Sequence, residues 1–263
     1  MNNRYIGALV LAPILIFLFL GGEPLKYLLL VASVMGLYEF YSVVSKKGIK
    51  PFKVVGYVAA IIYYLTLNNI TFEQVAIILF LVTMVLMCIP AIKPEYNYID
   101  VAVTVLGFIY VAVFFSFISK ISYKEGGRFL LWLVFLASWG CDTVAYYSGR
   151  LFGKHKLCPK VSPKKTIEGS IGGLLGAVIF CLVFGIIIKN HVNIPLYHYV
   201  IMAAIAGVFS QFGDLAASSI KRYSEVKDYS HLIPGHGGIL DRFDSILFSA
   251  VVIFYYLTYI ICI

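Results

Sequence analysis

The sequence predicts an all-α polytopic integral membrane protein with about nine transmembrane helices. Of its 263 residues, 61% are hydrophobic and only 13% are charged, and the mean hydropathy is +0.91. Soluble domains carry about 25% charged residues, so this chain has too few to cover a water-exposed surface. The composition therefore excludes a soluble enzyme, a disordered protein and a disulfide-stapled secreted domain.

Nine stretches of the chain are long and apolar enough for a spanning helix, which needs about 20 residues. The first resembles a signal peptide, but it has a long apolar run, no clear small-residue cleavage site and a second span directly after it. It is therefore expected to be a retained helix, kinked at Pro13 if anywhere. The third span is the shortest. The predicted spans are residues 4–21, 25–44, 52–68, 74–92, 100–119, 129–149, 169–188, 197–219 and 243–262.

The positive charges predict how these spans are oriented. Sixteen of the 21 Lys and Arg residues lie at the N-terminus or in the loops after spans 2, 4, 6 and 8, and five lie on the other side. Cytoplasmic loops collect Lys and Arg, so the N-terminus is expected in the cytoplasm and the C-terminus outside it. An even number of spans would break this asymmetry, which favours nine. The protein is thus expected to be a multi-pass protein of the inner or plasma membrane.

The same rule explains the net charge of +8, so nucleic acid is not an expected partner. The five cysteines are widely spaced and form no C-x-x-C pair, which argues against a disulfide framework and against a zinc site.

Polar residues divide the chain into two regions, 1–128 with about five spans and 129–263 with about four. In the first region only Glu39 is an acid well inside a span. It is expected to reach the membrane surface or to pair with a lysine of the loop at 46–53. The second region holds nearly every unusual polar group, so function is expected there, in a polar cavity that faces the cytoplasm.

Two acids lie inside spans of the second region. A charge at the bilayer centre costs about 2.5–3.5 kcal/mol, so such acids usually face a cavity or a partner. Asp142 lies in SWGCDTVAYYSGRLFG, where small and polar residues suit a water-filled cavity. Asp214 lies in SQFGDLAASSIKR, whose small residues indicate helix packing. Packing does not require an aspartate, so Asp214 is expected to be functional.

The densest polar stretch is residues 218–244. It ends in Asp241 and Asp244, whose i, i+3 spacing places both on one helix face. Two carboxylates so close favour a cation between them, and Mg²⁺ commonly binds through one or two carboxylates plus substrate phosphates. The preceding glycines of residues 234–238 allow a close approach to a ligand, and the N–H groups of the following helix start would be free for phosphate. The alternative is a polar loop with a capped helix start.

A second cluster, residues 162–169, has the sequence SPKKTIEG. Lys164 and Lys165 beside a hydroxyl could hold a polyphosphate. The alternative is a pair of cytoplasmic lysines followed by a helix capped at Thr166, with Glu168 in its first turn. Within the next span, overlapping G-x-x-x-G pairs indicate close helix packing; they involve Gly169, Gly172, Gly173 and Gly176.

Residues 218–244 resemble the signature of the phosphatidate cytidylyltransferases, also called CDP-diacylglycerol synthases. The resemblance covers the C-terminal half closely, including SPKKTIEG and the region of Asp142, whereas the N-terminal half agrees only in its apolar helices. The matching signature residues are Ser218, Lys221, Arg222, Lys227, Asp228, Pro234, His236, Gly237, Gly238, Asp241, Arg242 and Asp244.

The resemblance implies that CTP and phosphatidate react to give CDP-diacylglycerol and pyrophosphate, with Mg²⁺ required and a second cation left open. It places Asp214 and Asp241 among the metal ligands; the i, i+3 spacing adds Asp244, and Asp142 is a weaker candidate. The expected partners are CTP, phosphatidate and the lipid bilayer, and a homodimer is left open. Asp214, Asp241, Lys221, Arg222 and His236 are the candidate catalytic residues. The candidate substrate-binding residues are Ser162, Lys164, Lys165, Thr166, Lys227, Asp228, Gly237, Gly238 and Arg242.

Two other classes compete with this interpretation. A transporter or channel also carries intramembrane acids, but it predicts a repeat between the two halves, and none is visible. The second competing class is another membrane lipid enzyme, such as a polyprenol kinase or a CDP-alcohol phosphotransferase. The latter family is known for D-G-x-x-A-R and G-x-x-x-D-x-x-x-D, whereas this chain has D-x-x-D.

Overall fold

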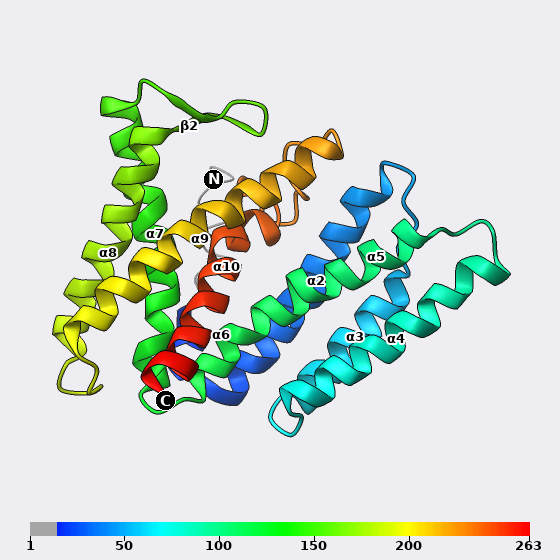
Figure 1. The fold of residues 1–263 in the computed structure, drawn as a ribbon, viewed down its shortest axis with the longest axis horizontal. Helices are drawn as coiled ribbons and strands as arrows, with labels where there is room; N and C mark the ends of the chain where they lie inside the picture. Colours follow the sequence, from blue (N-terminus) through cyan, green and yellow to red (C-terminus); the bar gives the residue numbers. More distant parts are fainter. Residues whose placement is uncertain (1–14) are drawn as a thin grey trace.

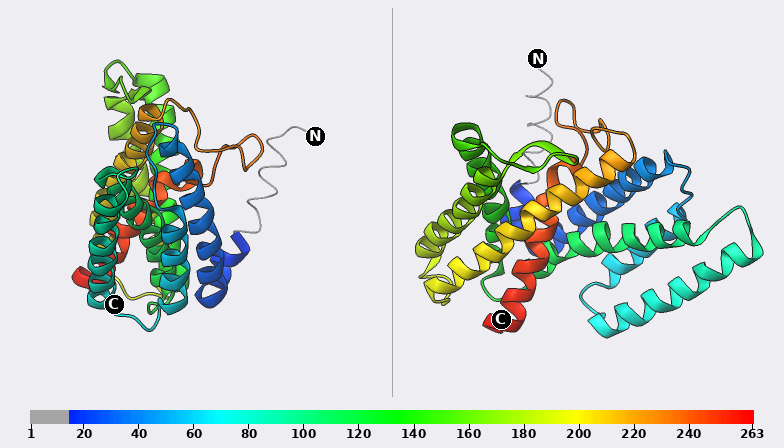
Figure 2. Two further views of the ribbon diagram at one scale, coloured as in Figure 1. Left: turned by 90° about the vertical axis from the view of Figure 1, so that its right-hand side faces the viewer. Right: turned by 45° about the horizontal axis from the view of Figure 1, so that its top comes forward.

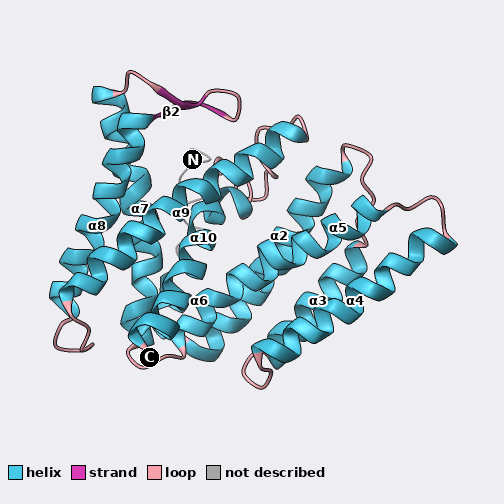
Figure 3. Ribbon diagram, viewed as in Figure 1, coloured by secondary structure: helices cyan, strands magenta, loops and turns pink. Residues whose placement is uncertain are grey.

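The computed structural model describes residues 15–263, which form a bundle of helices with one short β-hairpin (Figures 1 and 3). One predicted span continues through a π-helical turn, η1, between two α-helices, and the last helix ends in a second such turn, η2. The elements are α2 (Gly22–Ser45), α3 (Lys53–Thr66), α4 (Phe72–Ile92), α5 (Tyr98–Gly107), η1 (Phe108–Val113), α6 (Phe114–Ser122), α7 (Gly127–Phe152), β1 (Lys156–Cys158), β2 (Ser162–Thr166), α8 (Ile167–Ile188), α9 (Leu196–Tyr223), α10 (Leu240–Tyr256) and η2 (Leu257–Ile261).

The eight predicted spans between residues 25 and 262 all coincide with helices of the structure. Seven helical segments in the described part of the chain are long and apolar enough to cross a membrane. The eighth, α3, has only 14 residues, as the short apolar run predicted. The first predicted span, 4–21, lies mostly outside the described residues, as does Pro13. The chain is therefore an all-α, multi-pass membrane protein, and the count of nine spans stays a prediction.

The connections between helices alternate between two ends of the bundle. Those after α2, α7 and α9 lie toward the top of Figure 1, and those after α3, α6 and α8 lie toward the bottom, with the C-terminus. Contacts support this arrangement: the N–H of Gly22 donates to Ser122 Oγ at 3.2 Å, and Lys124 Nζ donates to the carbonyl of Ile263. Helix α2 thus begins at the end where α6 finishes and the chain terminates.

Glycines let α7 and α8 pack with their backbones in contact. A Cβ atom on Gly173 would lie 2.9 Å from the carbonyl oxygen of Cys141, and one on Gly176 would lie 2.5 Å from that of Gly140. Contacts this close exclude any side chain, which confirms the packing predicted from the glycine pattern. Gly213 of α9 plays the same part against α10, because its Cβ would lie 2.5 Å from the carbonyl oxygen of Asp244.

The two predicted regions of the chain share one hydrophobic core. Helices α2 and α6 from the first region pack against α10 from the second, and Leu37, Phe115 and Leu247 are all buried in the same cluster. Helices α3 and α4 stand to one side of this core (Figure 2). The first region therefore contributes directly to the surroundings of the signature segment.

Candidate functional site

A cavity of about 350 Å³ lies in the second region, between α7, α8, α9 and the β-hairpin. It brings the cluster at residues 162–169 next to the intramembrane acid Asp214, because Lys165 Nζ forms an ion pair of 2.6 Å with Asp214 Oδ2. Asp214 also accepts a hydrogen bond of 3.2 Å from Ser218, one helical turn later. The cavity is lined by Asp142, Ala145, Tyr146, Gly149, Arg150, Leu157, Lys164, Lys165, Thr166, Gly169, Ser170, Gln211 and Asp214.

The hairpin that presents the two lysines is fixed by the start of α8. Thr166 Oγ1 accepts a hydrogen bond of 3.1 Å from the N–H of Gly169, so Thr166 is the N-cap that the alternative interpretation predicted. Glu168 accepts bonds from the backbone N–H groups of Lys154 and His155 at 3.1 and 3.3 Å, which hold the loop entering the hairpin. The segment 162–169 therefore both caps α8 and carries the two lysines that line the cavity.

Asp142 connects the cavity to the signature helix. Its carboxylate lines the cavity on α7 and accepts a hydrogen bond of 3.2 Å from Ser245 of α10. Ser245 directly follows Asp244, so the acids of α7 and α10 approach each other where the two helices meet. Asp142 therefore lines the same cavity as Lys165 and Asp214.

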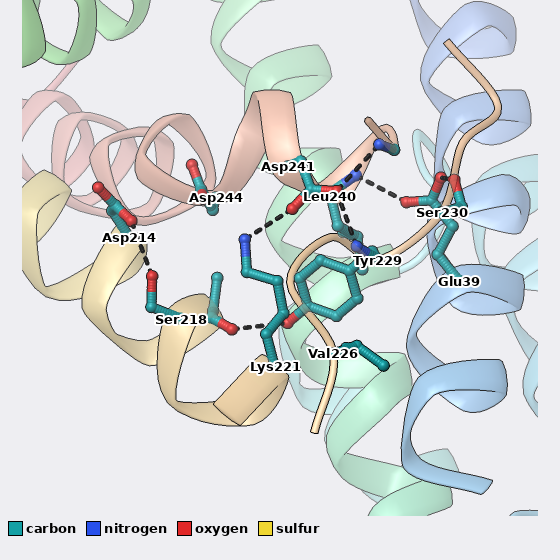
Figure 4. A network of polar contacts seen from close by, with 12 residues as sticks. Glu39, Asp214, Ser218, Lys221, Val226, Tyr229, Ser230, Leu240, Asp241 and Asp244 are labelled. Atoms are coloured by element: carbon teal, nitrogen blue, oxygen red, sulfur yellow. Dashed lines mark hydrogen bonds and ion pairs between the residues drawn. The ribbon is translucent and has the colours of Figure 1, made fainter. Parts of the chain in front are cut away.

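Asp241 lies at the start of α10 with its carboxylate nearly buried, 3% exposed. Its Oδ1 pairs with Lys221 Nζ at 2.6 Å, and its Oδ2 accepts bonds from the backbone N–H groups of Tyr229 and Gly238 at 2.8 and 2.9 Å (Figure 4). Three donors therefore surround this one carboxylate. Asp241 ties the end of α9, the 224–239 loop and the start of α10 together.

The two aspartates of α10 face different neighbours (Figure 4). Asp241 is directed toward Lys221, whereas Asp244 lies beside Asp214 of α9 and, among residues 15–263, accepts a bond only from the N–H of Ser245 at 2.8 Å. Within residues 15–263, no group of three or more His, Cys, Asp or Glu side chains is arranged for one metal ion. Asp214 and Asp244 nevertheless offer the oxygen ligands that suit Mg²⁺, which commonly needs only one or two carboxylates besides substrate phosphates.

Glu39 is a residue of the site that the sequence interpretation missed. It is fully buried, and it accepts hydrogen bonds from Ser230 Oγ at 2.6 Å and from the N–H groups of Ile239 and Leu240, both at 2.9 Å. The expectation that it reaches the membrane surface or pairs with a lysine of the 46–53 loop is therefore wrong. One signal in the sequence could have revealed this role. An acid inside an apolar span is costly, so Glu39 was bound to have a partner inside the protein.

The N–H groups at the start of α10 are not free, contrary to the expectation. Those of Ile239 and Leu240 donate to Glu39, and that of Gly238 donates to Asp241. A Cβ on Gly238 would lie 2.5 Å from a Glu39 carboxylate oxygen, so this glycine makes room for the acid. The start of α10 is therefore capped, as the alternative interpretation proposed. The carboxylates of Glu39 and Asp241 accept the bonds from its N–H groups.

The remaining candidates lie in the hairpin, at the end of α9, in the 224–239 loop and at the start of α10. Arg222 donates to the carbonyl oxygens of Val161 and Val226 at 3.4 and 3.3 Å, which brings the hairpin next to the end of α9. His236 Nδ1 lies 3.3 Å from the carbonyl oxygen of Pro234 in a tight turn, where Gly237 has a φ of 81° that favours glycine. Exposed or half-buried positions are occupied by Ser162, Lys227, Asp228 and Arg242.

Tyr229 is a buried residue of the 224–239 loop, next to Asp241. Burial raises the pKa of its hydroxyl, which donates a hydrogen bond of 3.4 Å to the carbonyl oxygen of Ala217. The tyrosine therefore stays neutral at physiological pH and acts as a structural donor. Lys221 lies 5.3 Å from the centre of its ring, a cation–π contact that further fixes this lysine.

Comparison with known proteins identifies the family of the chain. A model of the cytidylyltransferase family matches residues 2–260. Relatives named phosphatidate cytidylyltransferase include one from Thermotoga maritima, 32% identical over 95% of this chain and 93% of the relative, and one from Bacillus subtilis, 29% identical over 94% of each. The match to the Staphylococcus epidermidis protein of that name is 38% identical but spans only 58% of that protein. The chain belongs to the cytidylyltransferase family.

Proposed function

We propose that this protein is a phosphatidate cytidylyltransferase, which transfers the cytidylyl group of CTP to phosphatidate and releases pyrophosphate. Family membership and the names of the relatives support the reaction class. The observation that carries the proposal is the cavity that joins Lys164 and Lys165 to Asp142 and Asp214. It combines the cationic groups and the carboxylates that a triphosphate with a divalent cation requires.

The lysines of the hairpin are the groups that bind the triphosphate. Lys165 is 26% exposed and pairs with Asp214. A phosphate oxygen would compete with Asp214 for this ammonium group and leave a carboxylate oxygen of Asp214 free, and that oxygen is one of those that would hold the cation. The pair of Lys165 with Asp214 would therefore link nucleotide binding to the metal site. Lys221 stays paired with the buried Asp241, and this pair holds the end of α9 against the start of α10.

The side chains that would hold Mg²⁺ are Asp214 and Asp244, neighbours on α9 and α10. The carboxylate of Asp241, the third expected ligand, is already held by Lys221 and by the N–H groups of Tyr229 and Gly238. The ion supplies charge neutralisation to the phosphates during transfer. Asp142 lies close by on α7 and orients Ser245 next to Asp244. The four negative charges of the triphosphate would otherwise be repelled by these acids, so a divalent cation is required for the nucleotide to enter.

Transfer proceeds by attack of a phosphate oxygen of phosphatidate on the α-phosphorus of CTP. The new bond between this oxygen and the α-phosphorus forms as the bond from the α-phosphorus to the bridging oxygen breaks, and pyrophosphate leaves with the electron pair. A phosphate monoester is already an anion near neutral pH, so no strong base is needed. The protein's contribution is to position the two phosphates and to stabilise charge.

The lipid substrate reaches the site from the bilayer, and CTP reaches it from the cytoplasm. We therefore place the hairpin and the 224–239 loop on the cytoplasmic face of the inner or plasma membrane and the C-terminus on the opposite face. The excess of Lys and Arg in these loops supports this orientation. The homodimer stays a prediction.

A transfer assay on purified protein tests the proposal. CTP labelled at the α-phosphate is incubated with phosphatidate micelles in Mg²⁺ or in EDTA, and parallel reactions contain labelled ATP, GTP or UTP. We expect labelled lipid only with CTP and Mg²⁺. A well-folded protein that produces no labelled lipid would contradict the proposal.

A further inference from the structure

A groove with apolar walls lies between α3 and α4, which stand to one side of the core (Figure 2). Its volume of about 420 Å³ falls within the range of about 300–1,000 Å³ that ligand pockets occupy. It shares no lining residue with the cavity of Asp142 and Asp214. The groove is lined by Val54, Val55, Gly56, Val58, Ala59, Ile62, Tyr63, Thr66, Ile70, Val75, Ile78, Leu79, Val82, Leu86, Thr104 and Phe108.

The few hydroxyl groups on the walls of the groove have partners inside the protein. Thr66 and Thr104 each donate to the backbone carbonyl one helical turn earlier, at 2.8 and 2.6 Å. The hydroxyl of Tyr63 forms a hydrogen bond of 2.9 Å with Ser116 Oγ. No side-chain donor among the lining residues is left for a polar ligand, so the walls suit a hydrocarbon chain.

The groove extends over about the depth of one bilayer leaflet. Its lining residues on α3 run from Val54 to Thr66, twelve positions that span about 18 Å at a helical rise of about 1.5 Å per residue. Half of a hydrocarbon core about 30 Å thick is about 15 Å. On α4 the lining residues run from Val75 to Leu86 along one helix face. An acyl chain of one leaflet therefore fits along the groove.

One end of the groove adjoins a second hollow, of about 630 Å³, that carries two lysines. Val54 and Val55 line both spaces, and Lys50 and Lys53 line the second. No acid lines either space. Helix α3 begins at Lys53, and no side chain in residues 15–263 caps it, so the positive end of its dipole adds to the lysine charges. This mouth suits an anionic group.

The loop that carries the two lysines is fixed to the start of α5. The N–H of Lys50 donates to Asp100 Oδ1 at 2.6 Å, and that of Phe52 donates to Thr104 Oγ1 at 2.8 Å. The ring of Phe52 lies 4.9 Å from that of Tyr96. The backbone therefore presents the lysines in a fixed place beside the end of the groove.

We propose that the groove and the adjoining hollow bind one anionic phospholipid, with an acyl chain between α3 and α4 and its phosphate at Lys50 and Lys53. Basic pockets between transmembrane helices bind anionic head groups in this way. A second copy of the chain with the same orientation in the membrane carries the same excess of lysines at this end, so a lipid phosphate is the better complement. This lipid site is separate from the proposed site of transfer.

Thermal melting with added lipid tests this site without measuring transfer. The purified protein in a neutral detergent is titrated with phosphatidylglycerol, which is anionic, or with phosphatidylcholine, which has no net charge. We expect phosphatidylglycerol to raise the melting temperature more than phosphatidylcholine does. The double variant Lys50→Gln, Lys53→Gln is expected to need about 10- to 30-fold more phosphatidylglycerol for half of the maximal rise.

The double variant Lys46→Gln, Lys93→Gln is the matched control. It removes two exposed lysines that lie at the same end of the bundle and line neither space. We expect it to respond to both lipids as the wild type does.

Ala59→Phe tests the acyl-chain part of the site, because it places a ring in the groove. It is expected to reduce the rise with phosphatidylglycerol. Equal stabilisation by the two lipids, or an equal loss in both lysine variants, would overturn the inference. A dimer in light scattering whose melting responds to neither lipid would also overturn it, in favour of a second copy of the chain on this face.

Discussion

Lys165 of the hairpin and Asp214 of α9 form an ion pair of 2.6 Å between two segments that are distant in the sequence. The pair defines one wall of the cavity, with Asp142 and Lys164 also lining it. Both side chains keep partial exposure, 26% and 30%, so a ligand can reach them. By contrast, the pair of Lys221 with Asp241 is almost closed to solvent, at 11% and 3%. The first pair is therefore open to substrate, and the second maintains the structure around it.

Asp241→Asn is expected to abolish transfer and to lower stability while the protein still inserts and folds. The asparagine leaves the buried ammonium of Lys221 without its countercharge, and breaking a buried pair in this way costs about 3–5 kcal/mol. Thermal melting in detergent and the transfer assay measure the two effects. Near-normal turnover in this variant would contradict the role of Asp241.

The double variant Lys221→Met, Asp241→Asn separates structure from catalysis. Removing both charges is expected to recover most of the melting temperature, because no unpaired buried charge remains. Activity is expected to return in part with the melting temperature, because the pair maintains the structure around the site and is almost closed to solvent. Absent turnover in a double variant that melts like the wild type would contradict this structural role.

Glu39→Gln is expected to lower the melting temperature and the rate of transfer. A glutamine has one acceptor oxygen where Glu39 uses two, so at least one donor among Ser230, Ile239 and Leu240 loses its partner. A buried donor left unpaired costs about 1–3 kcal/mol. The start of α10, which carries Asp241, would then be less firmly held.

Glu225→Gln is the control for this change. A hydrogen bond from Lys47 holds the pKa of Glu225 below its usual range, but the glutamate side chain is 80% exposed. Exposed pairs contribute little to stability, so this variant is expected to melt and react as the wild type does. An equal loss in both variants would contradict the specific role assigned to Glu39.

The helices and the signature acids were predictable from the sequence, because membrane spans and charged residues inside them stand out against an apolar background. The close packing of α8 was also predictable, because Gly173 and Gly176 belong to overlapping G-x-x-x-G pairs. The pairing of Lys165 with Asp214 was not, because it depends on how the hairpin folds over α9. Local patterns carry no information on that distance.

The role of Glu39 could not be predicted because its donors are backbone groups, which every residue has. Nothing in the sequence near Ile239 and Leu240 marks them as partners of an acid in α2. The N-terminal half therefore looked like a set of apolar helices, although it supplies a carboxylate that caps the start of α10.

The orientation of the chain is tested by a topology reporter fused after Ile263. The alternating connections in Figure 1 and the excess of Lys and Arg in the loops near the cavity predict that this end lies outside the cytoplasm. We expect signal from a reporter that functions only there and none from a cytoplasmic reporter. A cytoplasmic C-terminus would mean that the number of spans differs by one.

The steady-state kinetics of Lys165→Met test most directly whether the cavity between the hairpin and α9 is the site of transfer. This change removes the charge that we propose binds phosphate, so kcat/KM for CTP is expected to fall about 10- to 100-fold. Lys160→Met removes a lysine from the exposed turn of the same hairpin, which does not line the cavity, and should leave the kinetics unchanged. Normal turnover in Lys165→Met, or an equal loss in both variants, would contradict the account.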